Sequence, residues 1–192
     1  KFAKDENTKV NAGVLYPYEI VEKAIALMGS NQWYSRGRNV ALDDTDRLMI
    51  NKYWNNLANY FNDCKLNALV MADTSGSMSG TPINVATSLA LYTAEKAGGP
   101  FANHYISFSS RPQLIECEGV DFCDKVNRIV RTNLCENTNI EAAFDMLLNT
   151  ATRNHLSQDD MPDTIIVVSD MEFDQGTRIG YNYGYNSNSY AA

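Results

Sequence analysis

The segment LNALVMADTSGSMSG, residues 66–80, constrains this chain most, because an apolar run stops there at an aspartate. The stretch LNALVMA lacks the regular alternation of polar and apolar residues found in half-exposed strands. Such a run is typical of a strand buried on both faces of a parallel sheet. Asp73, Ser75 and Ser77 then bring three oxygen side chains into one turn. The segment predicts an α/β fold with polar side chains at the end of a strand.

A second apolar run, DTIIVVSD at residues 163–170, also stops at an aspartate, Asp170. Predicted helices and strands alternate between the two runs, which favours a mostly parallel sheet. They are a helix from Thr81 to about Lys96, a hairpin of HYISFS and QLIECE, and helices in DFCDKVNRIV and NIEAAFDMLLNTAT. Ligands of open parallel sheets bind beyond the carboxyl ends of the strands. We therefore expect the two runs to be adjacent central strands that bring Asp73 and Asp170 together.

The first third of the chain is predicted to be helical. One amphipathic helix begins at Pro17 and ends at Gly29, and a second begins with the acidic turn after Asp43 and extends over DDTDRLMINKYWNNLANYFN. We expect a helical segment at 1–62, the end of a longer helical region, then an α/β domain at 63–178 and a low-complexity, disordered tail at 179–192.

Composition narrows the set of partners. The net charge of −7 disfavours direct binding to nucleic acid or to anionic membranes, and no apolar run approaches the length of a membrane span. The four cysteines, Cys64, Cys117, Cys123 and Cys135, form no C-x-x-C pair, which argues against zinc. We expect them to be reduced and mostly buried, as in a cytoplasmic protein.

The residues after the first strand predict a cation site. Carboxylate and hydroxyl oxygens suit a hard divalent cation, with Mg²⁺ as the default and Ca²⁺ or Mn²⁺ as alternatives. Asp73 and Asp170 would repel each other at adjacent strand ends unless a cation lay between them. Gly76 is predicted to let the backbone bend between the two serines.

Three segments of the chain resemble von Willebrand factor A domains, which carry a metal-ion-dependent adhesion site. DTSGSM resembles their D-x-S-x-S motif, NTNIEAAFD resembles their threonine segment, and VVSDMEFD resembles their aspartate segment. The resemblance implies a Rossmann-like fold, in which helices flank a central, mostly parallel sheet. It also implies five metal ligands, with the last two binding directly or through water: Asp73, Ser75, Ser77, Thr138 and Asp170.

Within that superfamily, SDMEFD, FSSRP and the upstream PYEIVEKA resemble an uncharacterised intracellular family of plant, fungal and viral proteins. That family is related to the Ro (TROVE) ribonucleoprotein autoantigen, in which an A domain follows a ring of RNA-binding helical repeats. The resemblance to the A domain covers residues 66–174, and a weaker one covers residues 10–60.

The chain departs from the family pattern at two places. Asn137 precedes Thr138 where the family usually has glycine. After Asp170 the family continues with further helices and two strands, whereas this chain has only a short polar stretch. Either the sequence is truncated or its sheet is abbreviated.

These features predict a cation-dependent protein-interaction module rather than an enzyme. An acidic side chain of a protein partner would complete the coordination of the metal, and RNA would bind through regions outside this chain. A metal-dependent phosphatase or phosphotransferase is one alternative, but haloacid-dehalogenase-like enzymes need a carboxylate where this chain has Ser75. Direct RNA binding through Arg36, Arg38 and the tail tyrosines is another.

Each proposed ligand also has a purely structural interpretation. Asp73 and Asp170 could cap turns, and Ser75 and Ser77 could be solvated turn residues. Thr138 begins the sequence T-N-I-E, a capping box with Glu141, so its hydroxyl could cap a helix instead of binding a metal.

Overall fold

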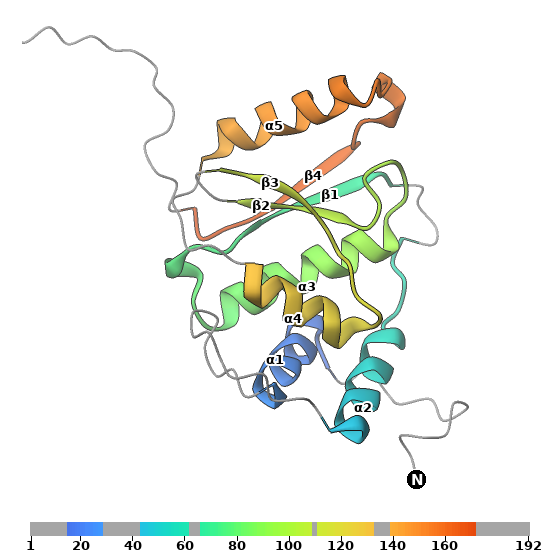
Figure 1. Cartoon of the computed structure of the whole chain (residues 1–192), viewed down its shortest axis with the longest axis vertical. Helices are drawn as coiled ribbons and strands as arrows, with labels where there is room; N and C mark the ends of the chain where they lie inside the picture. The colour runs from blue at the N-terminus through green and yellow to red at the C-terminus, as the bar shows by residue number, and fades with distance from the viewer. Residues whose placement is uncertain (1–14, 29–42, 62–65, 109–110, 133–138, 172–192) are drawn as a thin grey trace, which may run out of the picture.

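The computed structural model describes residues 15–28, 43–61, 66–108, 111–132 and 139–171 (Figure 1). One helix covers one face of a sheet, and the other helices form layers on the opposite face. The elements in chain order are α1 (Pro17–Leu27), α2 (Asp44–Asn55), β1 (Ala68–Asp73), the 3₁₀ turn η2 (Gly76–Met78), α3 (Thr81–Lys96), β2 (His104–Phe108), β3 (Gln113–Glu116), α4 (Phe122–Thr132), α5 (Ile140–Arg153), the 3₁₀ turn η3 (Gln158–Asp160) and β4 (Thr164–Val168).

Within the described residues, the sheet has four strands in the order β3-β2-β1-β4. β1 pairs in parallel with β2 and with β4, and the predicted hairpin β2–β3 is antiparallel. The predicted α/β class and mostly parallel sheet are thus confirmed, as is the pairing of the two apolar strands. The central position predicted for the second run is wrong within the described residues, because β4 pairs on one side only and its side chains are half-buried or exposed.

Residues with apolar side chains from four helices and β1 form one core on the α3 face of the sheet. Its buried members include Ile20, Trp54, Val70, Ala86 and Val126, which come from α1, α2, β1, α3 and α4 in turn. The buried alanines of α3, Ala86, Ala90 and Ala94, have small side chains that allow its close approach to β1. The described part of the N-terminal helical segment therefore packs on the same core as the sheet. Its assignment to a separate unit stays a prediction.

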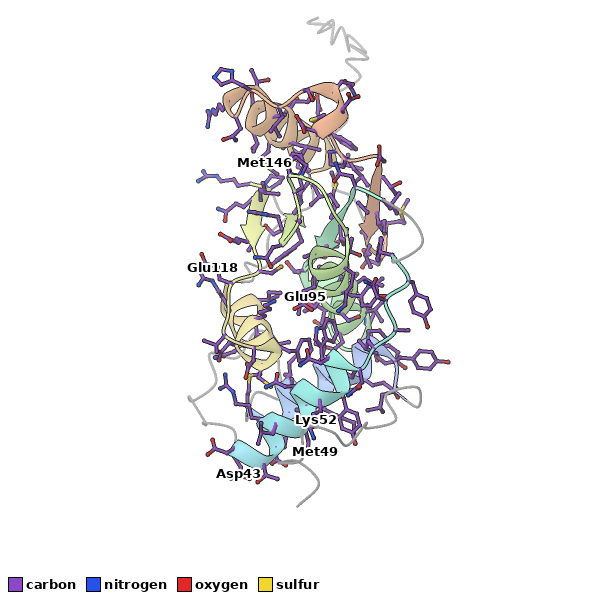
Figure 2. The ribbon with its side chains drawn as sticks, turned by 90° about the vertical axis from the view of Figure 1, so that its right-hand side faces the viewer. Asp43, Met49, Lys52, Glu95, Glu118 and Met146 are labelled. Carbon is purple, nitrogen blue, oxygen red and sulfur yellow. The ribbon has the colours of Figure 1, made fainter. Side chains whose placement is uncertain are left out.

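Trp54 is the largest side chain with which α2 packs into this core. Its indole is 1% exposed and stacks on Phe122, with ring centroids 4.1 Å apart. Its Nε1 donates a hydrogen bond of 2.8 Å to Glu95 Oε2, while Lys125 Nζ forms an ion pair with Glu95 Oε1 at 2.6 Å. Figure 2 labels Glu95 on α3, which thus receives contacts from both α2 and α4.

The second predicted helix is shorter in the structure than in the sequence analysis. α2 ends at Asn55 instead of continuing to residue 62. The hydroxyl of Tyr92 donates to the Ala58 carbonyl and accepts from the Tyr60 N–H, so a side chain of α3 binds backbone groups that a longer helix would pair internally. The predicted C-cap Gly29 lies outside the described residues, and Met28 caps α1.

On the other face of the sheet, α5 packs against β2 and β3. Leu69, Met71 and Ile106 form a second apolar cluster with Ala143 and Leu147 of α5. In Figure 2, Met146 also extends from α5 toward the sheet.

Cys117 and Cys123 are buried free thiols. Burial raises the pKa of each thiol to about 12, so neither is reactive at neutral pH. Cys64, Cys135 and the tail at 179–192 lie outside the described residues, so the expectations for them stay predictions. Among the helices that the structure describes, none has the length and apolar character needed to cross a membrane.

The first prediction concerns the anchoring of α2. Trp54→Ala should lower the free energy of unfolding by about 3–5 kcal/mol, because it removes a buried indole from the shared core. Leu48→Ala, on the same helix but at a position 41% exposed, is the control and should cost less than about 1 kcal/mol. Chemical denaturation measures both. Equal effects would contradict the view that α2 belongs to the core through Trp54.

The second prediction concerns Asp121, just before α4. Burial alone would raise the pKa of this carboxyl, but hydrogen bonds from Arg47, the Asp124 N–H and Asn51 hold the pKa below its ordinary value. A lowered pKa in the folded state stabilises the protein above the unfolded pKa of about 4, and that stabilisation is lost as pH falls through the lower folded pKa.

Asp121→Asn should therefore lower the free energy of unfolding at pH 7 by about 1–2 kcal/mol, and the difference from wild type should shrink as the pH falls below about 4. Denaturation curves across this pH range provide the measurement. Asp145→Asn, at an exposed position on α5, makes the same charge change without the network and serves as the control. A pH-independent difference for Asp121→Asn would refute the ionic interpretation.

Candidate metal centre

Asp73 is the last residue of β1, and its side chain is fully buried between neighbouring strands. Its Oδ1 accepts the Ser75 N–H at 2.9 Å, and its Oδ2 accepts the hydroxyl of Ser169 at 2.6 Å. No Lys, Arg or His side chain among the described residues forms an ion pair with it. Burying a carboxylate without a positively charged partner costs several kcal/mol, which two neutral hydrogen-bond donors offset only in part.

Ser75 and Ser77 place their hydroxyl groups together in the turn that follows. The two Oγ atoms lie 3.0 Å apart. Met78, the last residue of the 3₁₀ turn, is buried in the core. The Ser79 hydroxyl donates a hydrogen bond of 2.7 Å to the Gly76 carbonyl. The turn thus carries two neutral hydroxyl oxygens, on Ser75 and Ser77. These serines follow the buried Asp73 by two and four positions in the sequence.

The role predicted for Gly76 is wrong. Gly76 has no positive φ, and a Cβ added to it would meet no atom within 4 Å. Gly80 is the glycine that the backbone requires, since it takes a φ of 90° directly before α3. The bend between the serines is made instead by the short 3₁₀ turn Gly76–Met78.

The end of β4 brings a second aspartate to the same edge of the sheet. Ala72 pairs with Val168, so Ser169 lies beside Asp73 and Asp170 is one residue beyond. The side chain of Asp170 is exposed, in contrast to that of Asp73. The chain then turns at Met171, which has a φ of 67°. The two aspartates therefore lie at the ends of adjacent strands, as the sequence predicted, but in different environments.

Thr138 lies outside the described residues, as do Asn137, Glu172 and Asp174. The neighbouring Asn139 caps α5, and its Oδ1 accepts the Ala142 N–H at 3.0 Å. The alternative interpretation, in which Thr138 caps this helix, is therefore contradicted, because Asn139 is the cap. Figure 1 shows that α5 begins at the end of the sheet where β1 and β4 end.

The oxygen atoms at the end of β1 come mostly from serine hydroxyls, whereas many metal sites are built from His, Cys, Asp and Glu side chains. No group of three or more His, Cys, Asp or Glu side chains suited to a metal occurs in the part of the chain that the structure describes. A cation at the end of β1 would therefore depend on serine hydroxyls as well as on carboxylates. Such a neutral oxygen set suits a hard cation that retains bound water, which is the typical behaviour of Mg²⁺.

Sequence reasoning missed Ser169, whose hydroxyl donates a hydrogen bond to the buried carboxylate of Asp73. Neither apolar run alone gives this contact, because it depends on the register in which the two strands pair. The structure pairs Ala72 with Val168 and so places Ser169 beside Asp73, whereas an alignment of the two terminal aspartates, LVMAD with IVVSD, would place Ser169 opposite Ala72.

The comparisons with known proteins concern the part of the chain that holds this site. A family model described as "Domain of unknown function (DUF7788)" matches residues 67–191. The chain belongs to this family. The DUF7788 match begins one residue before β1 and includes both strand ends that form the candidate metal centre.

One relative is the "Uncharacterized protein L728" of Acanthamoeba polyphaga mimivirus, which is 28% identical over 183 residues. The match covers 92% of this chain, and it spans 29% of the length of the viral protein. At that coverage it includes most of the helical segment that precedes the DUF7788 region. No solved structure matches this chain.

Proposed function

We propose that this chain is a divalent-cation-dependent protein-interaction domain of the von Willebrand factor A type. The cation would be held by Asp73, Ser75 and Ser77, with Thr138 and Asp170 binding directly or through water. The observation that carries the proposal is the buried carboxylate of Asp73, which lies beside two serine hydroxyls 3.0 Å apart and has no ion-pair partner among the described residues.

The negative charge of the buried Asp73 carboxylate supports a bound cation rather than a purely structural turn. The N–H of Ser75 and the hydroxyl of Ser169 each donate one hydrogen bond to Asp73 but contribute no positive charge. A bound Mg²⁺ would compensate the carboxylate and leave coordination positions to water. When bound, the ion would supply an electrophilic contact point for a carboxylate of a partner protein.

The geometry favours binding over catalysis. Ser75 occupies the position where a phosphatase of the haloacid-dehalogenase type carries its acid/base carboxylate. His104 begins β2, whereas Phe108 pairs with Asp73, so this histidine lies at the opposite end of the sheet. Its Nδ1 lies 2.8 Å from the Ala102 carbonyl, in a local backbone contact. Membership of a cytoplasmic, RNA-associated complex of the Ro type is part of the proposal and rests on the sequence resemblance.

Thermal melting with Mg²⁺ and with chelator tests the proposal. Mg²⁺ should stabilise the wild type by about 2.7 kcal/mol when its free concentration is a hundred times the dissociation constant. Asp73→Ala should abolish this stabilisation, and Ser77→Ala should reduce it. In chelator, Asp73→Ala should melt near the wild type, because the loss of two hydrogen bonds is offset by the removal of a buried charge.

Identical melting of the wild type with Mg²⁺ and with chelator would mean that the serine turn binds no cation. A separate assay addresses the enzyme alternative. We expect no Mg²⁺-dependent hydrolysis of a generic phosphate ester. Turnover that disappears in Asp73→Asn would replace the interaction domain with a phosphatase.

A further inference from the structure

We propose that Ser169 is a positioning residue of this cation site, whose hydroxyl holds Asp73 and the loop that carries Asp170 in one arrangement. The inference rests on the proposed function, because it concerns how that site binds its cation. Ser169 is half-buried at the end of β4, beside the last residue of β1.

Two hydrogen bonds define the role of the Ser169 hydroxyl. Its Oγ donates to Asp73 Oδ2 at 2.6 Å and accepts the Met171 N–H at 3.1 Å. The direction of each bond is fixed, because an ionised carboxylate only accepts and a backbone N–H only donates. The bond to Asp73 has the length of a charge-assisted O–H···O⁻ bond. The hydroxyl proton and one lone pair are thus used within the protein, which separates Ser169 from the predicted ligands.

The carboxylate of Asp73 is consequently held from two sides. The Ser75 N–H fixes Oδ1 from the turn after β1, and Ser169 fixes Oδ2 from the end of β4. Each carboxylate oxygen retains capacity for a further contact, since an ionised carboxylate accepts up to about four hydrogen bonds. A carboxylate fixed in this way need not be reoriented when a cation arrives, so binding loses less conformational freedom.

The same hydroxyl also stabilises the loop after β4. Met171 has a φ of 67°, a left-handed conformation that is unfavourable for a residue with a Cβ. Its N–H bonds back to Ser169 Oγ across Asp170, which closes the turn on which that aspartate is carried. One side chain therefore links the buried aspartate of β1 to the exposed aspartate that follows β4.

The experiment compares Ser169→Ala with Ser169→Thr in the full chain. Isothermal titration with Mg²⁺ and with Ca²⁺ gives the affinity and stoichiometry of each folded variant. Ser169→Ala should lower Mg²⁺ affinity by about tenfold, as is typical when the partner of a metal ligand is removed. It should lower Ca²⁺ affinity less, because the larger ion tolerates irregular ligand geometry. Ser169→Thr retains the hydroxyl and should bind within about threefold of the wild type.

Ser157→Ala is the matched control. It removes a serine–aspartate hydrogen bond of 2.7 Å, between Ser157 and Asp160, in the turn that precedes β4 rather than at the cation site. Its affinity for Mg²⁺ should equal that of the wild type.

The outcomes separate this inference from the proposed function. If the wild type binds neither cation, the proposed function fails and the inference fails with it. If the wild type binds Mg²⁺ and Ser169→Ala binds it equally well, only the inference is overturned. A reduced stoichiometry at unchanged affinity would mean that Ser169 acts on folding alone, and it also overturns the inference. Equal losses of affinity in the Ala and Thr variants, with an unchanged ratio of Mg²⁺ to Ca²⁺ affinity, would also overturn the inference.

Discussion

The parallel pairing of β1 with β4 is the constraint on which the candidate site depends. The register Ala72 to Val168 places Asp73 beside Ser169 and brings Asp170 to the same edge of the sheet. Asp73 is then buried by its neighbours, and its carboxylate is fixed by hydrogen bonds from the ends of both strands. A slip of one residue would move the aspartate to the other face of the sheet and separate these groups. The site is therefore a property of strand register as much as of the D-x-S-x-S sequence.

The helices on the α3 face provide the rigid support for that register. α3 follows the serine turn directly and packs against β1, so movement of the turn would require movement within the core. Trp54 and Glu95 extend the support to α2, and Lys125 extends it to α4. This arrangement gives the N-terminal helices a structural role in the same body as the sheet. The similarity to the viral protein likewise extends over most of the N-terminal helical segment as well as the DUF7788 region.

Local sequence signals predicted those features that local chemistry determines. The uncharged apolar runs predicted β1 and β4 and their parallel pairing, and Thr81–Pro82 predicted the start of α3. Features set by distant contacts were missed. The end of α2 depends on Tyr92, which is far along the chain, and the bond from Ser169 depends on a register that a single strand does not encode. The position of β4 at the edge of the described sheet was missed because a run apolar on both faces indicates burial and gives no strand order.

The most direct measurement of the cation site is an anomalous difference map from crystals grown with Mn²⁺. We predict one peak at the end of β1, about 2.0–2.6 Å from an oxygen of Asp73 and from the hydroxyls of Ser75 and Ser77. Asp73 should keep its bonds to the Ser75 N–H and to Ser169 in that map. A saturating Mn²⁺ concentration that gives no peak there, with the same hydrogen bonds intact, would contradict the cation site and leave the serine turn as a structural feature of the fold.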